Sequence, residues 1–172
     1  MGAHALTAGP AEAFVAIESA ADAAAFRPEL RRLYDYWAGI APPGRLPGRI
    51  HFDPLDIPSL LPMLWLLEVH RAPLRFRYRL VGTRFASLHG IDPTGRWLDE
   101  AFPEAPVGNF LTRLEFVVTR GVPAWRRGVA LVGHGLDWQT LETLALPLAS
   151  DGCTVDMVLG GTLRHQNEFT IP

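Results

Sequence analysis

Two neighbouring stretches near the middle of the chain follow the two-residue period of β-strands. In residues 76–81, FRYRLV, aromatic or aliphatic side chains alternate strictly with arginine or valine, as in a strand with one buried face. The apolar run at residues 63–69 predicts a preceding strand, and residues 71–74 predict the turn between them. The arginines of the second strand share one face, which we expect to be wet or paired with Glu68, because unpaired charges are costly to bury.

Two other stretches, residues 28–40 and 107–120, repeat apolar side chains at the spacing of one helix face. Gly121 follows the second and is a typical helix stop. The apolar face of the first helix could pack on the chain's own sheet or on another copy of the chain. The first face comprises Leu30, Leu33, Tyr34, Trp37 and Ile40, and the second Val107, Phe110, Leu111, Leu114, Val117 and Val118.

Three further strands are predicted towards the C-terminus. Gly128 lies inside the first and suggests a bulge, and Pro147 suggests that the late part of the second lies at a sheet edge. Asp151-Gly152 predicts a tight hairpin between the last two strands. The three strands are expected at residues 123–132, 138–149 and 154–163.

The remaining segments are helical turns, loops and termini. Pro10, in an Ala-rich N-terminal stretch, predicts the start of a helix that runs through Ile17. Thr83 is a suitable N-cap for a short helix that Gly90 ends, and residues 97–102 predict one more helical turn. The chain thus divides into an extension, a helix with a proline-rich linker, a core and a tail, at residues 1–27, 28–62, 63–165 and 166–172.

Composition limits the number of domains, the partners and the cellular location that we expect. The 172 residues, 48% of them hydrophobic, suit one globular domain with extensions. A net charge of -2 gives no general attraction to nucleic acid or anionic lipid, so neither is predicted as a partner. The single cysteine, Cys153, predicts a reducing compartment. No apolar run is long enough to span a membrane and the N-terminus lacks a secretory pattern, so we expect a cytoplasmic protein.

The order of the predicted elements resembles that of a PAS domain. The phrase FRYRLVGTRFASLHGIDPTGRWLDEAFP, residues 76–103, is similar to the second strand, the pocket helices and the TG-containing turn of that family. Upstream, YDYWAGI and LPGRIHFDPLDIPSLLPMLWLLEV resemble a subgroup of bacterial stand-alone PAS proteins with a Trp-bearing helix and no attached output domain. The resemblance spans residues 30–163.

This resemblance implies an α+β fold with a five-stranded antiparallel sheet in the order 2-1-5-4-3, helices on one face and an N-terminal helical extension. It also implies a sensory or protein-interaction module whose small, apolar ligand lies between helices and sheet. Many such domains form homodimers through the N-terminal helix. The implied ligand-binding residues are Tyr78, Phe85, Leu88, Trp97, Phe110, Leu114, Trp125, Trp138 and Met157, and the implied dimer interface is Leu30, Leu33, Tyr34 and Trp37.

The residues that could carry chemistry are few. No nucleophile motif, phosphate-binding loop or histidine pair at metal spacing occurs, so we expect neither enzymatic activity nor a metal site. A flavin photosensor of this fold needs a reactive cysteine after the second strand, whereas Cys153 lies in the last hairpin. His89 and His134 are candidate cofactor ligands, although a lone histidine is more often solvated or hydrogen-bonded. The cofactor therefore stays unknown.

Two functions remain open from the sequence. The first is a non-enzymatic sensory or interaction module in bacterial signalling that binds a small molecule. The alternative is a dimerisation or scaffold domain without a ligand, and a small-molecule enzyme is the less favoured third option. In either case we expect a homodimer and a separate signalling protein as partner.

Overall fold

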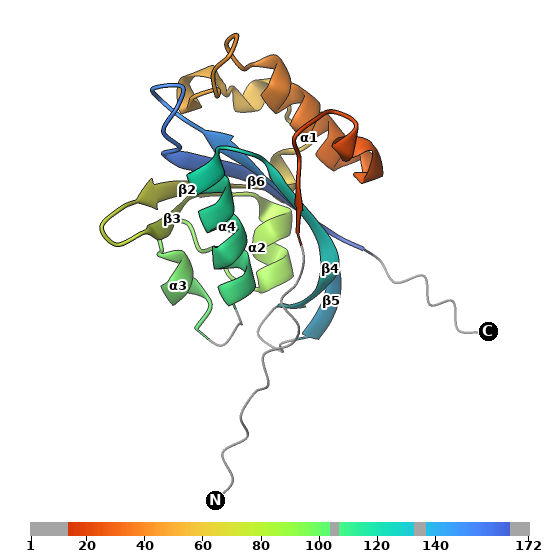
Figure 1. Cartoon of the computed structure of the whole chain (residues 1–172). Coiled ribbons are helices and arrows are strands. Elements are labelled where there is room, and N and C mark those ends of the chain that lie inside the picture. The colour runs from red at the N-terminus through yellow and green to blue at the C-terminus, as the bar shows by residue number, and fades with distance from the viewer. Residues whose placement is uncertain (1–13, 104–106, 133–136, 166–172) are drawn as a thin grey trace, which may run out of the picture.

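The structure is a computed structural model that describes residues 14–103, 107–132 and 137–165 (Figure 1). At its centre is a six-stranded sheet in the order β1-β4-β5-β6-β2-β3, and every neighbouring pair is antiparallel. Five of these strands stand in the order that the resemblance implies, so the predicted α+β fold is confirmed. The strands are β1 (Val15–Ala16), β2 (Leu64–His70), β3 (Arg75–Val81), β4 (Ala124–Val132), β5 (Asp137–Leu148) and β6 (Met157–Arg164).

The strand β1 lies where the sequence predicted a helix. Val15 pairs with Trp125 and Ala16 with Ala124, and the Ile17 N–H donates to the Pro123 oxygen at 2.9 Å. These bonds use backbone groups that the edge of β4 would otherwise expose. The helix prediction is wrong at residues 15–16, because pairing with an open strand edge outweighs the helix preference of an Ala-rich stretch, and its predicted start at Pro10 lies outside the described residues.

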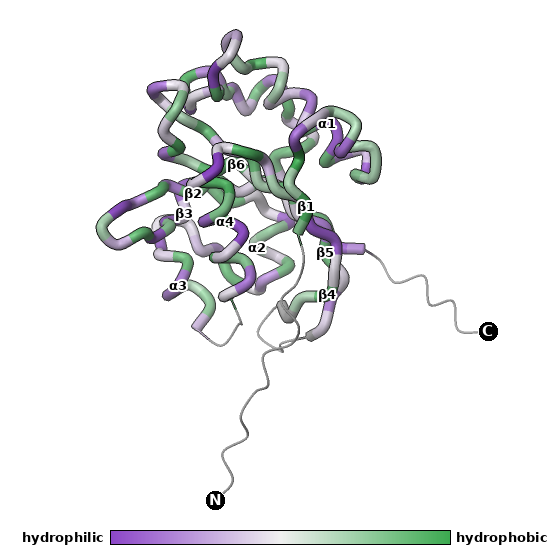
Figure 2. Tube along the Cα trace, in the orientation of Figure 1, coloured by the Kyte–Doolittle hydropathy of each residue, from purple (hydrophilic) through white to green (hydrophobic). Residues whose placement is uncertain are grey.

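Both faces of the sheet are covered. Leu64 and Leu66 point to one face and Trp65 and Leu67 to the other, because side chains alternate along a strand, and all four are buried. The two sets belong to two separate hydrophobic clusters. A strand buried on both sides needs a continuous apolar run, which explains the sequence LWLL. Hydrophobic residues accordingly follow the middle strands of the sheet (Figure 2).

Different elements cover the two faces (Figure 1). We call the side that carries α2 (Thr83–His89), α3 (Leu98–Ala101) and α4 (Gly108–Arg120) the helix face. The opposite side, the α1 face, carries α1 (Pro28–Gly39) and the linker that follows it. Short 3-10 turns lie before and along that linker, at Asp22–Ala25, Arg49–His51, Pro54–Asp56 and Leu61–Met63.

Glycines end α2 and α4 as predicted. Gly90 follows α2 with φ 74° and Gly121 follows α4 with φ 63°, the left-handed conformation that glycine adopts without strain. The start of α2 differs from the prediction by one residue, since Gly82 occupies the N-cap position and Thr83 is already helical.

The link between β5 and β6 is longer than the predicted tight hairpin, because residues 149–156 separate the two strands. Asp151 Oδ1 accepts the N–H groups of Cys153 and Thr154 at 2.8 and 2.6 Å, which folds the link into its own compact turn. The Leu46 N–H donates to the Gly152 oxygen at 3.0 Å, so the linker after α1 holds this turn in place. Long-range bonds of this kind cannot be read from an Asp-Gly pair alone.

Two predictions about single strand positions have opposite outcomes. Pairing between β4 and β5 ends at Ala145. Pro147, two residues further along β5, pairs only with Val158 of β6. It therefore lies at a local edge, as predicted. Gly128 pairs with Leu141 in a continuous register, so the bulge predicted there is wrong.

Candidate functional site

The helix face encloses the cluster in which the sequence placed a ligand. Its buried side chains come from the strands β2 to β6 and from Val155 on one side, and from α2, α3 and α4 on the other. We call this set the helix-side cluster. Its buried members are Trp65, Leu67, Phe76, Tyr78, Phe85, Leu98, Ala101, Leu114, Val117, Ala124, Ala145, Val155 and Val158.

Trp65 is the largest side chain in the cluster and is fully buried. Its indole and the Phe110 ring lie nearly perpendicular to each other, with a centroid distance of 5.4 Å. Its Nε1–H donates to Thr162 Oγ1 at 3.0 Å, which satisfies the one polar group that the indole brings into the core. Trp65 is therefore held by both an aromatic contact and a hydrogen bond.

Four rings lie in contact where α2 meets β3. The His89 ring is 4.4 Å from Phe85 and 4.8 Å from Phe102, and the Tyr78 ring is 6.0 Å from Phe85 and 6.2 Å from Phe102. Burial lowers the pKa of His89 to about 4, so its imidazole is neutral at physiological pH. Burial also raises the pKa of the Tyr78 hydroxyl. These rings fill the space that they share.

The structure brings only part of the predicted ligand set together. Tyr78, Phe85 and Leu114 are buried members of the helix-side cluster, and Phe110 packs against it. Leu88, on α2, is half-buried. The other four predicted residues lie elsewhere in the fold.

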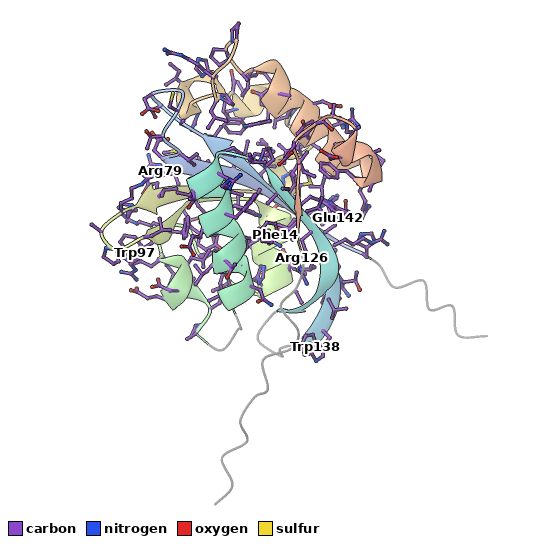
Figure 3. All side chains as sticks on the ribbon, in the orientation of Figure 1. Phe14, Arg79, Trp97, Arg126, Trp138 and Glu142 are labelled. Atoms are coloured by element: carbon purple, nitrogen blue, oxygen red, sulfur yellow. The ribbon has the colours of Figure 1, made fainter. Side chains whose placement is uncertain are left out.

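Trp97 lies outside the cluster, at the outer edge of β3 (Figure 3). The Arg75 guanidinium stacks over its ring at 4.3 Å, and His70 contacts it at 4.8 Å. Arg75 also pairs with Asp99 at 2.8 Å and with Glu100 at 2.6 Å. Trp97 thus belongs to a surface network that ties β3 to α3.

Trp125, Trp138 and Met157 are also away from the helix-side cluster. Trp125 and Met157 pack against the cluster of the α1 face, since their strand positions point to that side. Trp138 lies near the start of β5 with 68% of its surface exposed (Figure 3). Their aromatic or apolar character suggested a pocket, but register decides the face and only the folded sheet fixes it.

The residues predicted for a dimer interface lie inside the chain's own core. Leu30, Leu33, Tyr34 and Trp37 are all buried against the α1 face of the sheet. The Trp37 Nε1–H donates to the Pro147 oxygen at 2.8 Å. These four side chains are not available to a second copy while α1 stays packed. This favours packing of α1 on the chain's own sheet over packing on another copy.

A buried carboxylate on the α1 face was not predicted. Glu142, on β5, is 0% exposed. Its Oε1 accepts the Arg27 N–H at 2.8 Å and the Trp125 Nε1–H at 3.0 Å, and its Oε2 lies 3.0 Å from His165 Nε2. Because Arg27 immediately precedes α1, the carboxylate also lies at the positive end of that helix. The sequence signal for this buried carboxylate was a glutamate in a strand whose neighbouring positions on the same face are mostly apolar.

Glu142 therefore joins three distant parts of the chain: the start of α1, the strand β4 and the end of the last strand (Figure 3). Such a carboxylate is tolerated in a core because each of its oxygens has a hydrogen-bond partner. Its partners are structural groups, so the arrangement stabilises the packing of α1 rather than presenting a reactive acid.

Three exposed apolar side chains lie along the β4–β5 hairpin and the strand β1 beside it. Val129 is 46% exposed and Trp138 is 68% exposed. Val15 on β1 is 46% exposed and pairs with Trp125, two pairs of positions along β4 from Val129. Register places all three side chains on the α1 face, with the exposed Arg127 on the same face between Val15 and Val129. We call Val15, Val129 and Trp138 the hairpin patch.

Among the residues that the structure describes, no group of three or more histidine, cysteine or carboxylate side chains could hold a metal ion. His89 is held between two aromatic rings, and His134 lies outside the described residues. Within the same described ranges, none of the helices has the length and apolar character that crossing a membrane requires.

Comparison with known proteins agrees with this architecture. A profile of the PAS domain family matches residues 25–163. No curated protein matches the chain. The match includes α1, the linker and all five strands from β2 to β6.

Three similar solved structures are light-oxygen-voltage proteins. One is a light-oxygen-voltage domain studied with a flavin analogue, 15% identical with a TM-score of 0.48 over 67% of this chain and 85% of that one. The blue-light photoreceptor Aureochrome1 LOV in its light state is 15% identical, with a TM-score of 0.46 over 66% and 89%. An RNA-binding light-oxygen-voltage receptor is 14% identical, with a TM-score of 0.46 over 72% of this chain and 37% of that one. With the family profile covering most of its length, the chain belongs to the PAS domain family.

Proposed function

We propose that the chain is a non-catalytic PAS sensory or interaction module that acts by binding another protein on the hairpin patch, and that a second copy of the chain is one such partner. The observation that carries the proposal is the exposure of Trp138, 68%, at the end of the sheet. A large exposed aromatic residue is typical of an anchor in a protein interface. A bacterial, cytoplasmic signalling pathway with a separate output protein is part of this proposal.

A second copy suits this surface for a simple reason. A two-fold symmetric interface brings the same surface together with itself, so it must be self-complementary. Val129 and Trp138 are diagonal neighbours in the β4–β5 register and both are uncharged and apolar, so this part of the surface meets its own copy without repulsion. Because the apolar side chains of α1 are buried, this surface rather than that helix is available for association.

Sedimentation velocity of the full chain between about 1 and 100 μM, the range of modest protein associations, tests the proposal. We expect a concentration-dependent dimer whose dissociation constant rises about ten-fold or more in Trp138→Glu, because an interface anchor is lost and two charges meet. Leu55→Glu is the matched control, since Leu55 is 81% exposed and outside the hairpin patch. A wild-type chain that stays monomeric over this range, or equal weakening by both variants, would contradict self-association through this patch.

A second candidate function is binding of a small apolar ligand in the helix-side cluster. It is favoured by the partial exposure of Phe102, Val107 and Phe110, which pack on the cluster but are not fully buried. A ligand entering there would contact Tyr78 and Leu114 after displacement of neighbouring rings. Native mass spectrometry of the purified chain should show added mass that Leu114→Trp removes. A wild-type spectrum at the mass of the chain alone would contradict it.

A further inference from the structure

A pocket of about 440 Å³ opens on the α1 face, on the other side of the sheet from the helix-side cluster. Its walls come from the Arg49–His51 turn in the linker and from β2, β3 and β6. The volume falls in the range of small-molecule sites. The lining residues are Arg49, Leu66, Glu68, Arg79, Leu80 and Met157.

An irregularity in the strand pairing creates this pocket. The β2–β3 register shifts between Leu66, which pairs with Leu80, and Leu67, which pairs with Tyr78, so that Arg79 has no cross-strand partner. In a regular strand Arg79 and Leu80 would point to opposite faces. The bulge allows both to line the same pocket, which is how bulges commonly redirect a side chain at a site.

The rim of the pocket carries more positive than negative charge. Arg49 is held in place, because its Nη1 donates to the Phe52 oxygen at 2.8 Å and its guanidinium lies 5.3 Å from the Phe52 ring. Arg79 lies 3.9 Å from Glu68, and its side chain is 67% exposed (Figure 3). Glu68 is shared, since it is also 3.5 Å from His70. Two guanidinium groups thus face one carboxylate, which leaves one positive charge unbalanced.

The floor of the pocket is apolar. Leu66 is buried, while Leu80 and Met157 are half-buried and pack on the same cluster. Methionine adapts its shape readily to different apolar groups. A complementary occupant would therefore place an apolar part on this floor and one negative charge between the two arginines.

We infer that this pocket binds a small amphipathic monocarboxylate, with its carboxylate at Arg49 and Arg79 and its aliphatic part on Leu66, Leu80 and Met157. Guanidinium groups bind carboxylates through charge-assisted hydrogen bonds. The apolar floor adds the burial that a bare inorganic anion would lack. This site is separate from the hairpin patch and from the helix-side cluster, so it gives the module a second input on the opposite face of the sheet.

Titration of the full chain with sodium octanoate, followed by two-dimensional amide NMR, tests the inference. We expect the chemical-shift changes to concentrate on Glu68, Arg79, Leu80 and Met157. Octanol, which has the same chain length without the charge, should bind about ten-fold more weakly, because it cannot pair with the arginines. Changes centred on Phe85 and Phe102 instead, or equal affinity for octanol, would overturn the inference and leave the proposed protein contact unaffected.

Two variants with opposite expected effects separate binding from folding. Arg79→Ala should raise the octanoate dissociation constant about five-fold, with the thermal midpoint little changed because the side chain is mostly exposed. Glu68→Gln removes the competing carboxylate and should lower that constant about two-fold. Arg84→Ala, an exposed arginine on α2, is the matched control and should have no effect. Equal loss of affinity in the Arg79 and Arg84 variants, or weaker binding by Glu68→Gln, would overturn the assignment.

Discussion

Gly160, on β6, lies directly across from Trp65 on β2. A Cβ at this position would overlap the ring atoms of the indole, so the absence of a side chain is what lets the ring lie across the strand. That position in turn brings Trp65 Nε1 within hydrogen-bond distance of Thr162. We expect Gly160→Ala to lower the free energy of unfolding by about 1–3 kcal/mol, as overpacking does in other cores, measured by urea denaturation.

The matched control for this prediction is Gly39→Ala. Gly39 is helical, and a Cβ there would have no atom within 4 Å. Because alanine favours helix over glycine, this change should be neutral or stabilise by up to about 1 kcal/mol. A Gly160→Ala variant as stable as the wild type would show that the indole does not depend on this close approach.

His89 makes the stability of the fold depend on pH. Its pKa is lowered by burial from 6.5 to about 4. Well above pH 6.5 the imidazole is neutral in both folded and unfolded chains. As pH falls from 6.5 towards 4, the unfolded chain takes up a proton that the folded chain does not, so the free energy of unfolding decreases by up to about 3 kcal/mol. His89→Leu should flatten this part of the pH profile in denaturation experiments.

His70→Gln serves as the control for that experiment. His70 is exposed at the end of β2 and lies outside the group of rings around His89, so the variant controls for the loss of a histidine as such. If the wild-type and His89→Leu chains lose stability equally across this window, the imidazole of His89 is not kept neutral by its surroundings.

At the scale of elements, α1 acts as part of the core of its own chain. Leu33 is fully buried and packs with sheet residues of the α1 face. Leu33→Ala should therefore lower the free energy of unfolding by about 2–4 kcal/mol through the cavity that it leaves. Sedimentation of the folded variant should give the same association state as the wild type. A variant that keeps its stability and loses association would instead assign α1 to an interface between copies.

The elements themselves were largely predictable from the sequence. The strict alternation of β3 and the helical stripes of α1 and α4 are local patterns, and their predicted bounds agree with the structure to within one residue. The strand β1 was not predictable, because only the open edge of β4, far along the chain, makes residues 15–16 extended. The register shift beside Arg79 also depends on pairing between strands rather than on the strand's own pattern.

The candidate sites were less predictable than the fold. Tyr78 and Leu114 could be assigned to the helix-side cluster from strand alternation and helix spacing. Trp125 and Met157 could not be, because the face that a strand residue occupies is set by pairing as well as by pattern. The buried role of Glu142 depends on Arg27, Trp125 and His165, which only the folded chain brings together.

At the scale of the whole molecule, one sheet separates two hydrophobic clusters that share its strands. Leu33 belongs to the cluster of the α1 face and Leu114 to the helix-side cluster, and both are 0% exposed. Since the strands between them carry side chains into both clusters, the two layers should unfold together. We expect Leu33→Ala and Leu114→Ala to be additive within about 0.5 kcal/mol, because the two side chains share no contact across the sheet.

The measurement is urea denaturation of the two single variants and the double variant, followed both by tryptophan fluorescence and by circular dichroism. Coincident transitions with one midpoint are expected for each chain, because the β2 residues Leu64 and Trp65 join the two faces within one strand. Two separate transitions would mean that α1 and the linker detach as an independent layer before the sheet unfolds. In that case ligands on the α1 face would bias the docking of α1, and the pocket at Arg49 and Arg79 would be lost in the first transition, since one wall comes from the linker.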